Sequence, residues 1–223
     1  MAWERVSRWV VLSAAVMLCC GAKCLAQDAG EDHTCTVSGG AVVVSLPKGT
    51  DGHNFQTSHE GLQAGGGFQV WTNNQRSGFR VLVTANYVFQ KFTASGPALS
   101  AAKAADPAHL ANATAAHGTF SAVTLDPTVR YAVNQHWGLY GSGGFGWLRR
   151  SIGFTGANPA TLQHPSGTSL LRLSSDSGAF DAGGGVNINV YRGLMAFAEV
   201  RVYRGMAING STTLVPISVG LRW

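Results

Sequence analysis

Histidines are the side chains in this sequence best suited to metal binding or to acid–base catalysis, and there are seven of them. None forms the His-x-x-x-His spacing that sets two ligands on one face of a helix, and no paired-cysteine metal motif accompanies them. They are His33, His53, His59, His109, His117, His136 and His164. The sequence therefore predicts no metal ligands and no cofactor, and a weak metal site built by loops is the alternative.

One of these histidines, His117, lies four residues before a potential nucleophile, Ser121. Four residues along a strand span about 13 Å, whereas a hydrogen bond joins atoms roughly 3 Å apart. The two side chains could act together only if the chain folded back between them. We therefore expect no catalytic residues and no enzymatic activity.

Glycine runs raise the question of a phosphate-binding loop, because Gly141-Ser142-Gly143-Gly144-Phe145-Gly146 has glycines at a suitable spacing. Such a loop must lead into a helix, but residues 147–153 continue as a strand. Glycines inside strands mark bends or close approach of neighbouring chains. We expect this run, with 65–67 and 183–185, to relieve crowding on the inner face of a curved sheet.

The last ten residues show the element that recurs along the chain, a strand with two different faces. Successive strand side chains point to opposite sides. One side carries Val215, Ile217, Val219, Leu221 and Trp223, and the other carries Pro216, Ser218, Gly220 and Arg222. An apolar face that ends on an indole suits a strand in lipid that stops at the membrane interface. Pro216 has no backbone donor and predicts a local irregularity.

Eight segments have strand character, near residues 36–47, 59–72, 78–92, 119–133, 137–154, 178–191, 195–206 and 213–223. Long and short connections alternate between them. Barrels of the outer membrane have an even number of strands, short periplasmic turns and longer loops outside. The sequence therefore predicts an all-β fold, an eight-stranded antiparallel up-and-down transmembrane β-barrel over 36–223, with both ends at the periplasmic rim.

The strand pattern puts apolar side chains outside and polar ones inside, which is the reverse of a soluble barrel. Six charged residues then share the lumen: Arg80, Arg130, Asp181, Glu199, Arg201 and Arg222. Eight strands leave an interior just wide enough for side chains, and charges there must pair or be hydrated. We expect a salt-bridged, hydrated plug. The alternative is a narrow pore that prefers anions, because arginines outnumber acids.

The N-terminus has the layout of a secretory signal, with Arg5 and Arg8, an apolar run, and small residues before Gln27. We assign residues 1–26 to a signal peptide and 27–35 to a periplasmic tail. Removal of the signal peptide lowers the formal net charge from +5 to +3. It also leaves Cys35 as the single remaining cysteine, so no intramolecular disulfide is expected. A charge this small does not suggest nucleic-acid binding.

From Val37 onward the chain resembles the small outer-membrane β-barrel family, with an architecture similar to the eight-stranded transmembrane domain of outer-membrane protein A. The matching stretches are residues 60–68, 182–186, 197–203 and 215–223. The resemblance implies recognition of the C-terminal strand by the outer-membrane insertion machinery, with Trp223 as the signal. It implies no catalytic signature.

Together these observations predict a non-enzymatic, monomeric protein of the cell outer membrane with a structural or surface-interaction role. Three loops, 48–58, 93–118 and 155–177, would meet an extracellular ligand of unknown kind, and lipid would surround the strands. A low-conductance porin is the first alternative. A lipid-modifying membrane enzyme is the second.

Overall fold

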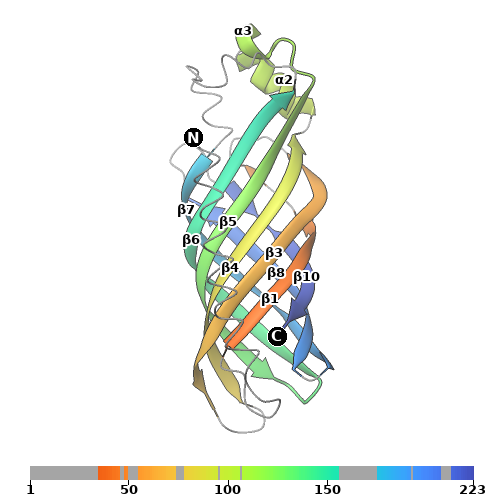
Figure 1. Ribbon diagram of the computed structural model, residues 1–223. Coiled ribbons are helices and arrows are strands. Elements are labelled where there is room, and N and C mark those ends of the chain that lie inside the picture. The colour runs from red at the N-terminus through yellow and green to blue at the C-terminus, as the bar shows by residue number, and fades with distance from the viewer. Residues whose placement is uncertain are drawn as a thin grey trace.

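The fold is a single closed antiparallel sheet, seen in a computed structural model (Figure 1). The structure describes residues 35–45, 48–49, 55–73, 78–94, 96–105, 107–155, 175–191, 193–206 and 212–223. The predicted signal peptide and residues 27–34 of the predicted tail lie outside these ranges. Cys35, which the sequence analysis places in the tail, is the first residue of the first strand.

Ten strands and two short helices follow one another along the described chain. They are β1 (Cys35–Ser45), β2 (Lys48–Gly49), β3 (Phe55–Thr72), β4 (Phe79–Ala94), α2 (Gly96–Ala105), α3 (Pro107–Leu110), β5 (Ala115–Ala132), β6 (Trp137–Thr155), β7 (Ser175–Tyr191), β8 (Leu194–Gly205), β9 (Thr212–Leu214) and β10 (Pro216–Arg222). Both helices lie at the upper end of the barrel in Figure 1. Neither of them is long and apolar enough to cross a membrane.

Eight of the strands form a ring, because β10 pairs with β1 on one side and with β8 on the other. The remaining strands, β2 and β9, pair with each other and extend the wall above the ring. Val37 and Trp223 exchange two backbone hydrogen bonds of 2.9 and 2.8 Å, which close the seam. The predicted eight-stranded antiparallel up-and-down barrel is confirmed.

The Val37–Trp223 end of the seam lies at the rim that carries the short connections. Short connections join β3 to β4, β5 to β6 and β7 to β8 at this rim, and Gly193, directly before β8, has a φ of 85°, a conformation that a glycine adopts without strain. In the 133–136 turn, Asn134 Oδ1 accepts hydrogen bonds from the backbone of His136 and Trp137 at 2.8 and 3.0 Å. By the usual rule for outer-membrane barrels this rim is periplasmic.

The strands run further toward the loop side than the sequence pattern predicts. β3 begins at Phe55 and β5 at Ala115, so the predicted loops 48–58 and 93–118 include strand residues. The reason is that the backbone ladder continues after the alternation of side chains has ended, as the pairing of His117 with Thr93 and Gly153 shows. Within the predicted loop 93–118, the alanine-rich residues Gly96–Ala105 form the helix α2.

The irregularity predicted at Pro216 is also present. The last strand is interrupted at Val215, so β9 ends at Leu214 and β10 starts at the proline. The partner strand β1 shifts its register between Val42 and Val44. A proline at the first position of a strand leaves no ladder donor missing within it.

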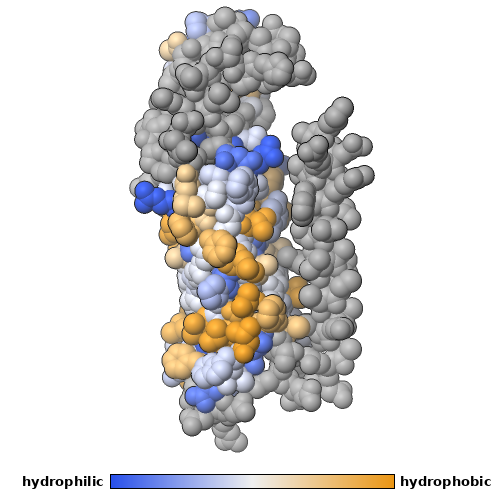
Figure 2. All heavy atoms as spheres, turned by 90° about the vertical axis from the view of Figure 1, so that its left-hand side faces the viewer, coloured by the Kyte–Doolittle hydropathy of each residue, from blue (hydrophilic) through white to orange (hydrophobic). Residues whose placement is uncertain are grey.

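The outer wall is apolar, as predicted. Figure 2 shows hydrophobic side chains gathered along the middle of the barrel, with hydrophilic residues nearer its two ends. Aromatic rings stand at the periplasmic end of this surface: Trp71, Phe79, Trp137, Tyr191 and Trp223 are all exposed. A bilayer requires a surface of this kind: an apolar wall with an aromatic belt, on a closed ring of strands that leaves no free sheet edge.

The lumen is filled in two layers. The layer on the loop side is mainly apolar and includes the stacked rings of Phe92 and Phe120, whose centroids are 4.5 Å apart. Its members are Val42, Val88, Phe92, Phe120, Ala122, Leu148, Ala179, Tyr203 and Leu214. We call this the apolar layer. Below it, toward the periplasmic rim, lies a layer of buried charged side chains and their hydrogen-bonding partners, which we call the ionic layer. Its charged members are Asp126, Asp181, Glu199, Arg201 and Arg222.

Candidate functional site

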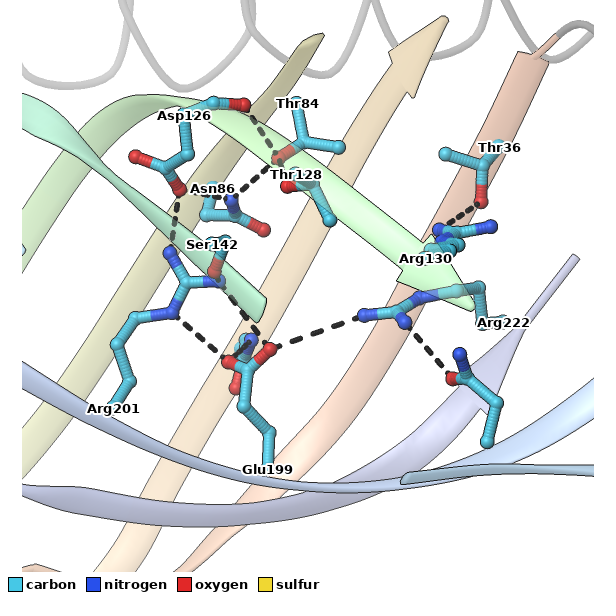
Figure 3. A network of polar contacts seen from close by, with 12 residues as sticks. Thr36, Thr84, Asn86, Asp126, Thr128, Arg130, Ser142, Glu199, Arg201 and Arg222 are labelled. Atoms are coloured by element: carbon cyan, nitrogen blue, oxygen red, sulfur yellow. Dashed lines mark hydrogen bonds and ion pairs between the residues drawn. The ribbon is translucent and has the colours of Figure 1, made fainter. Parts of the chain in front are cut away.

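Arg201 is the centre of the ionic layer (Figure 3). Its Nη1 atom lies 2.5 Å from Asp126 Oδ2 and 2.6 Å from Asp181 Oδ2, and its Nε donates to Glu199 Oε1 at 3.0 Å. The arginine side chain is 3% exposed and the three acids are 1% exposed or less. One guanidinium therefore pairs with carboxylates from three strands, β5, β7 and β8.

Glu199 extends the network across the seam of the barrel. It accepts a hydrogen bond of 2.9 Å from Gln63 on β3 and lies 4.0 Å from Arg222 Nη2 on β10. Arg222 in turn donates to Asn187 at 2.9 Å. Its guanidinium also lies over the rings of Tyr140 and Phe197, 4.4 and 4.8 Å from their centroids, so cation–π contacts hold it as well.

Asp126 is a member of the network that the sequence analysis missed. It is fully buried, and it accepts hydrogen bonds from Asn86 at 2.6 Å and Thr124 at 3.1 Å besides the contact with Arg201. Its position could have been found, because Asp126 has the same strand parity as Arg130, which was placed in the lumen.

A second residue missed by the sequence analysis is Arg150, which is 1% exposed. It lies opposite Phe120 in the β5–β6 ladder, beside the apolar layer and above the ionic one. The predicted lumen held two acids and four arginines. Asp126 adds a third acid in the ionic layer. The excess of arginines over acids there is therefore smaller than the sequence predicted.

The glycine runs make room for these side chains, as predicted. A Cβ atom at Gly183 would lie 2.9 Å from the Cβ of Arg201 and 2.7 Å from the carbonyl oxygen of Val200. A Cβ at Gly65 would lie 2.6 Å from Asn86 Oδ1. The inner wall has no space for a side chain at these positions.

Arg130 and Arg80 stand nearer the periplasmic rim. Arg130 donates to Thr36 at 3.3 Å and, with Arg201 and Arg222, lines a small cavity. Arg80 lies directly opposite Arg130 in the β4–β5 ladder. The structure thus joins Asp181, Glu199, Arg201 and Arg222 into one network and sets the other two predicted residues beside it.

The candidate nucleophile and base are not brought together. His117 and Ser121 belong to the continuous strand β5, where they pair with Gly153 and Arg149 of β6, so the chain does not fold back between them. Within the described ranges, no three His, Cys, Asp or Glu side chains are grouped as metal ligands. His33, His53 and His164 lie outside those ranges.

The ionic layer fills the lumen and links the strands around it. Its charges are buried and paired with partners from opposite walls, which costs desolvation. Single atoms of the layer, among them Asp126 Oδ1 and Asp181 Oδ1, have no hydrogen-bond partner in the described part of the chain. The cavity beside it has room for about one water molecule. A filled ring of this kind ties β3, β5, β7, β8 and β10 together through side chains in addition to the backbone ladder.

Comparison with known proteins supports the architecture. No protein-family model matches the sequence, and no curated protein matches it. Among solved structures, the chain is similar to Neisserial surface protein A (12% identity, 85% of this chain, 96% of the other, TM-score 0.50). It also matches the Ail protein of Yersinia pestis bound to the heparin analogue sucrose octasulfate (12%, 85%, 96%, TM-score 0.45).

A third match is the N-terminal β-barrel domain of OprF from Pseudomonas aeruginosa (11% identity, 84% of this chain, 97% of the other, TM-score 0.39). At these identities the likeness concerns the fold alone. Of the three structures, the Neisserial protein has the highest TM-score. The ring of eight strands, the apolar outer wall and the polar lumen agree with that fold. This chain therefore has the fold of the small eight-stranded outer-membrane β-barrels, and its lipid-facing wall belongs in the outer membrane.

Proposed function

We propose that this barrel is a non-enzymatic protein whose loop-side end binds a partner outside the cell. The observation that carries the proposal is the filled lumen. The apolar layer and the ionic layer occupy it one above the other, and the cavity between the arginines has room for about one water molecule. The filled lumen then stabilises the barrel, and the part of the chain outside the membrane binds the partner.

The loop-side end is the part of the molecule available for binding. There β5 and β6 extend to Ala115 and Thr155, and helices α2 and α3 stand on the connection between β4 and β5. Outer-membrane barrels carry variable function on such loops while the strands hold them rigidly. The extracellular partner is of unknown chemistry.

Replacement of single loops tests this proposal. Residues 96–112 can be replaced by a short glycine–serine turn, because the β4–β5 ladder remains paired up to Thr93 and His117. We expect loss of cell adhesion with unchanged envelope integrity. Replacement of the periplasmic turn 133–136 is the matched control and should leave adhesion intact. If every loop replacement preserves adhesion, and only envelope integrity falls, the role is structural alone.

The second candidate is a narrow pore that prefers anions. Arg130, Arg201 and Arg222 line the cavity and no carboxylate does, which favours it. Planar-bilayer recordings of the refolded protein separate the two candidates. The proposed surface role predicts a flat baseline, whereas discrete steps with an anion-selective reversal potential would support the pore. A lipid-modifying activity would instead appear as a mass change in co-incubated lipid A or phospholipid.

We further propose that the barrel is monomeric in lipid and is inserted by the outer-membrane insertion machinery through its last strand. The terminal side chain, Trp223, is exposed on the outer wall, where a receptor can reach it before the ring closes. Deletion of Trp223 should reduce the amount of barrel in outer-membrane fractions. Unchanged recovery would argue against this signal.

A further inference from the structure

We infer that the cavity in the ionic layer is a binding site for a small monovalent anion of the halide class. The cavity is lined by Thr36, Ser38, Gly66, Thr84, Asn86, Thr128, Arg130, Tyr140, Arg201 and Arg222. This lining holds three guanidinium groups, an amide and several hydroxyls, and no carboxylate. These groups are hydrogen-bond donors, and an anion can accept hydrogen bonds from them.

The charge on Arg130 is the first argument. Arg130 donates a 3.3 Å hydrogen bond to Thr36, a neutral group, and no carboxylate of the described chain forms an ion pair with it. Arg201, by contrast, has three carboxylate partners. Arg130 is half-buried, and a guanidinium in a narrow lumen is stabilised by a counter-charge, because desolvation of an ion without one is costly.

The second argument is the grouping of like charges. Arg80 and Arg130 are direct cross-strand neighbours, an arrangement that is destabilising for equal charges. Arg222 lines the same cavity from β10, and in Figure 3 it lies next to Arg130. An anion between Arg130 and Arg222 reduces the repulsion among the guanidinium groups.

The third argument comes from donors left over by the protein. The Nε of Arg130 is buried and has no hydrogen-bond partner within the described structure, and the buried hydroxyl of Tyr140, which lies close to Glu199, forms no hydrogen bond of good geometry there. Tyr140 is 5% exposed. Both atoms can donate, both residues line the cavity, and buried donors are normally satisfied.

The size of the cavity selects the ligand. With room for about one water molecule, it accepts chloride or bromide and excludes sulfate, phosphate or an organic acid. Such a halide would act as a fixed part of the lumen, completing the charge balance of the ionic layer. The site is independent of whatever the loops bind.

Stability measured in different salts tests the inference. The folded barrel in detergent should become more stable as sodium chloride replaces sodium gluconate at constant ionic strength, with saturation, because gluconate is too large to enter. Arg130→Gln should weaken the midpoint of this chloride dependence about tenfold or more, as loss of a charged buried hydrogen bond does. Arg149→Gln, at an exposed position of β6, is the matched control and should not change it.

A second measurement does not depend on variant stability. Crystals grown in bromide should show an anomalous peak between Arg130, Arg222 and Tyr140. Equal stabilisation by chloride and gluconate, chloride dependence that survives Arg130→Gln, or a cavity without a bromide peak would each overturn the inference and leave the cavity to water.

Discussion

The apolar layer and the ionic layer fill the same tube by opposite chemistry. In the apolar layer, rings and aliphatic chains such as Phe120 and Leu148 are fully buried and gain from packing alone. In the ionic layer, a single guanidinium holds three carboxylates, and each group depends on specific partners. Packing is graded and tolerant of similar shapes, whereas a buried ion network fails when one member is lost.

The largest expected effect is therefore in the ionic layer. Arg201→Met removes the cation from Asp126, Asp181 and Glu199 and leaves their carboxylates buried together. We expect a loss of about 3–5 kcal/mol in the free energy of unfolding, measured by urea titration in lipid vesicles. Arg204→Met, at an exposed site on the same strand, is the control and should change stability by less than about 0.5 kcal/mol.

A rescue variant sharpens this prediction. If uncompensated charge causes the loss, adding Asp126→Asn and Asp181→Asn to Arg201→Met should recover part of it, since two of the three acids then become neutral. No recovery would mean that packing of the arginine stem, and not its charge, dominates the ionic layer.

In the apolar layer the expected effect depends on volume. Leu148→Ala removes a fully buried side chain and should cost about 3 kcal/mol, because the surrounding rings cannot collapse into the space. Leu148→Met conserves the volume and should cost less than about 1.5 kcal/mol. Equal losses for the two variants in urea titration would contradict the packing description.

A glycine between the wall and the network should respond to added volume. Gly183→Ala places a Cβ against Arg201 and the carbonyl of Val200. We expect a loss of about 1–3 kcal/mol, the usual cost of overpacking. Gly39→Ala is the matched control, since nothing lies within 4 Å of its added Cβ, and it should be nearly neutral. The same urea titration makes the comparison.

The smallest effect is expected where the two layers approach each other. Thr124→Val removes the hydroxyl that donates to Asp126 at 3.1 Å, while Asn86 and Arg201 still satisfy the same oxygen. The expected loss is about 1 kcal/mol. A loss as large as that of Arg201→Met would show that the network is less redundant than its contacts indicate.

Much of the fold could be predicted from local pattern. Alternation with a period of two residues assigns each side chain to one face, and four of the six predicted lumen charges, Asp181, Glu199, Arg201 and Arg222, are buried inside the barrel. The number of strands followed from the alternation of long and short connections. The strand ends were less predictable, because the ladder at Phe55 and His117 outlasts the pattern of side chains.

By itself, then, the sequence determined that lipid-facing and lumen-facing side chains alternate along the strands and that the ring is even and closed, because these properties depend on neighbours along a strand. Only the tertiary structure decided which lumen residues meet. Asp126 reaches Arg201 and Gln63 reaches Glu199 across 75 and 136 positions of the chain. Those contacts depend on the stagger of all eight strands in the closed ring, which no local pattern contains.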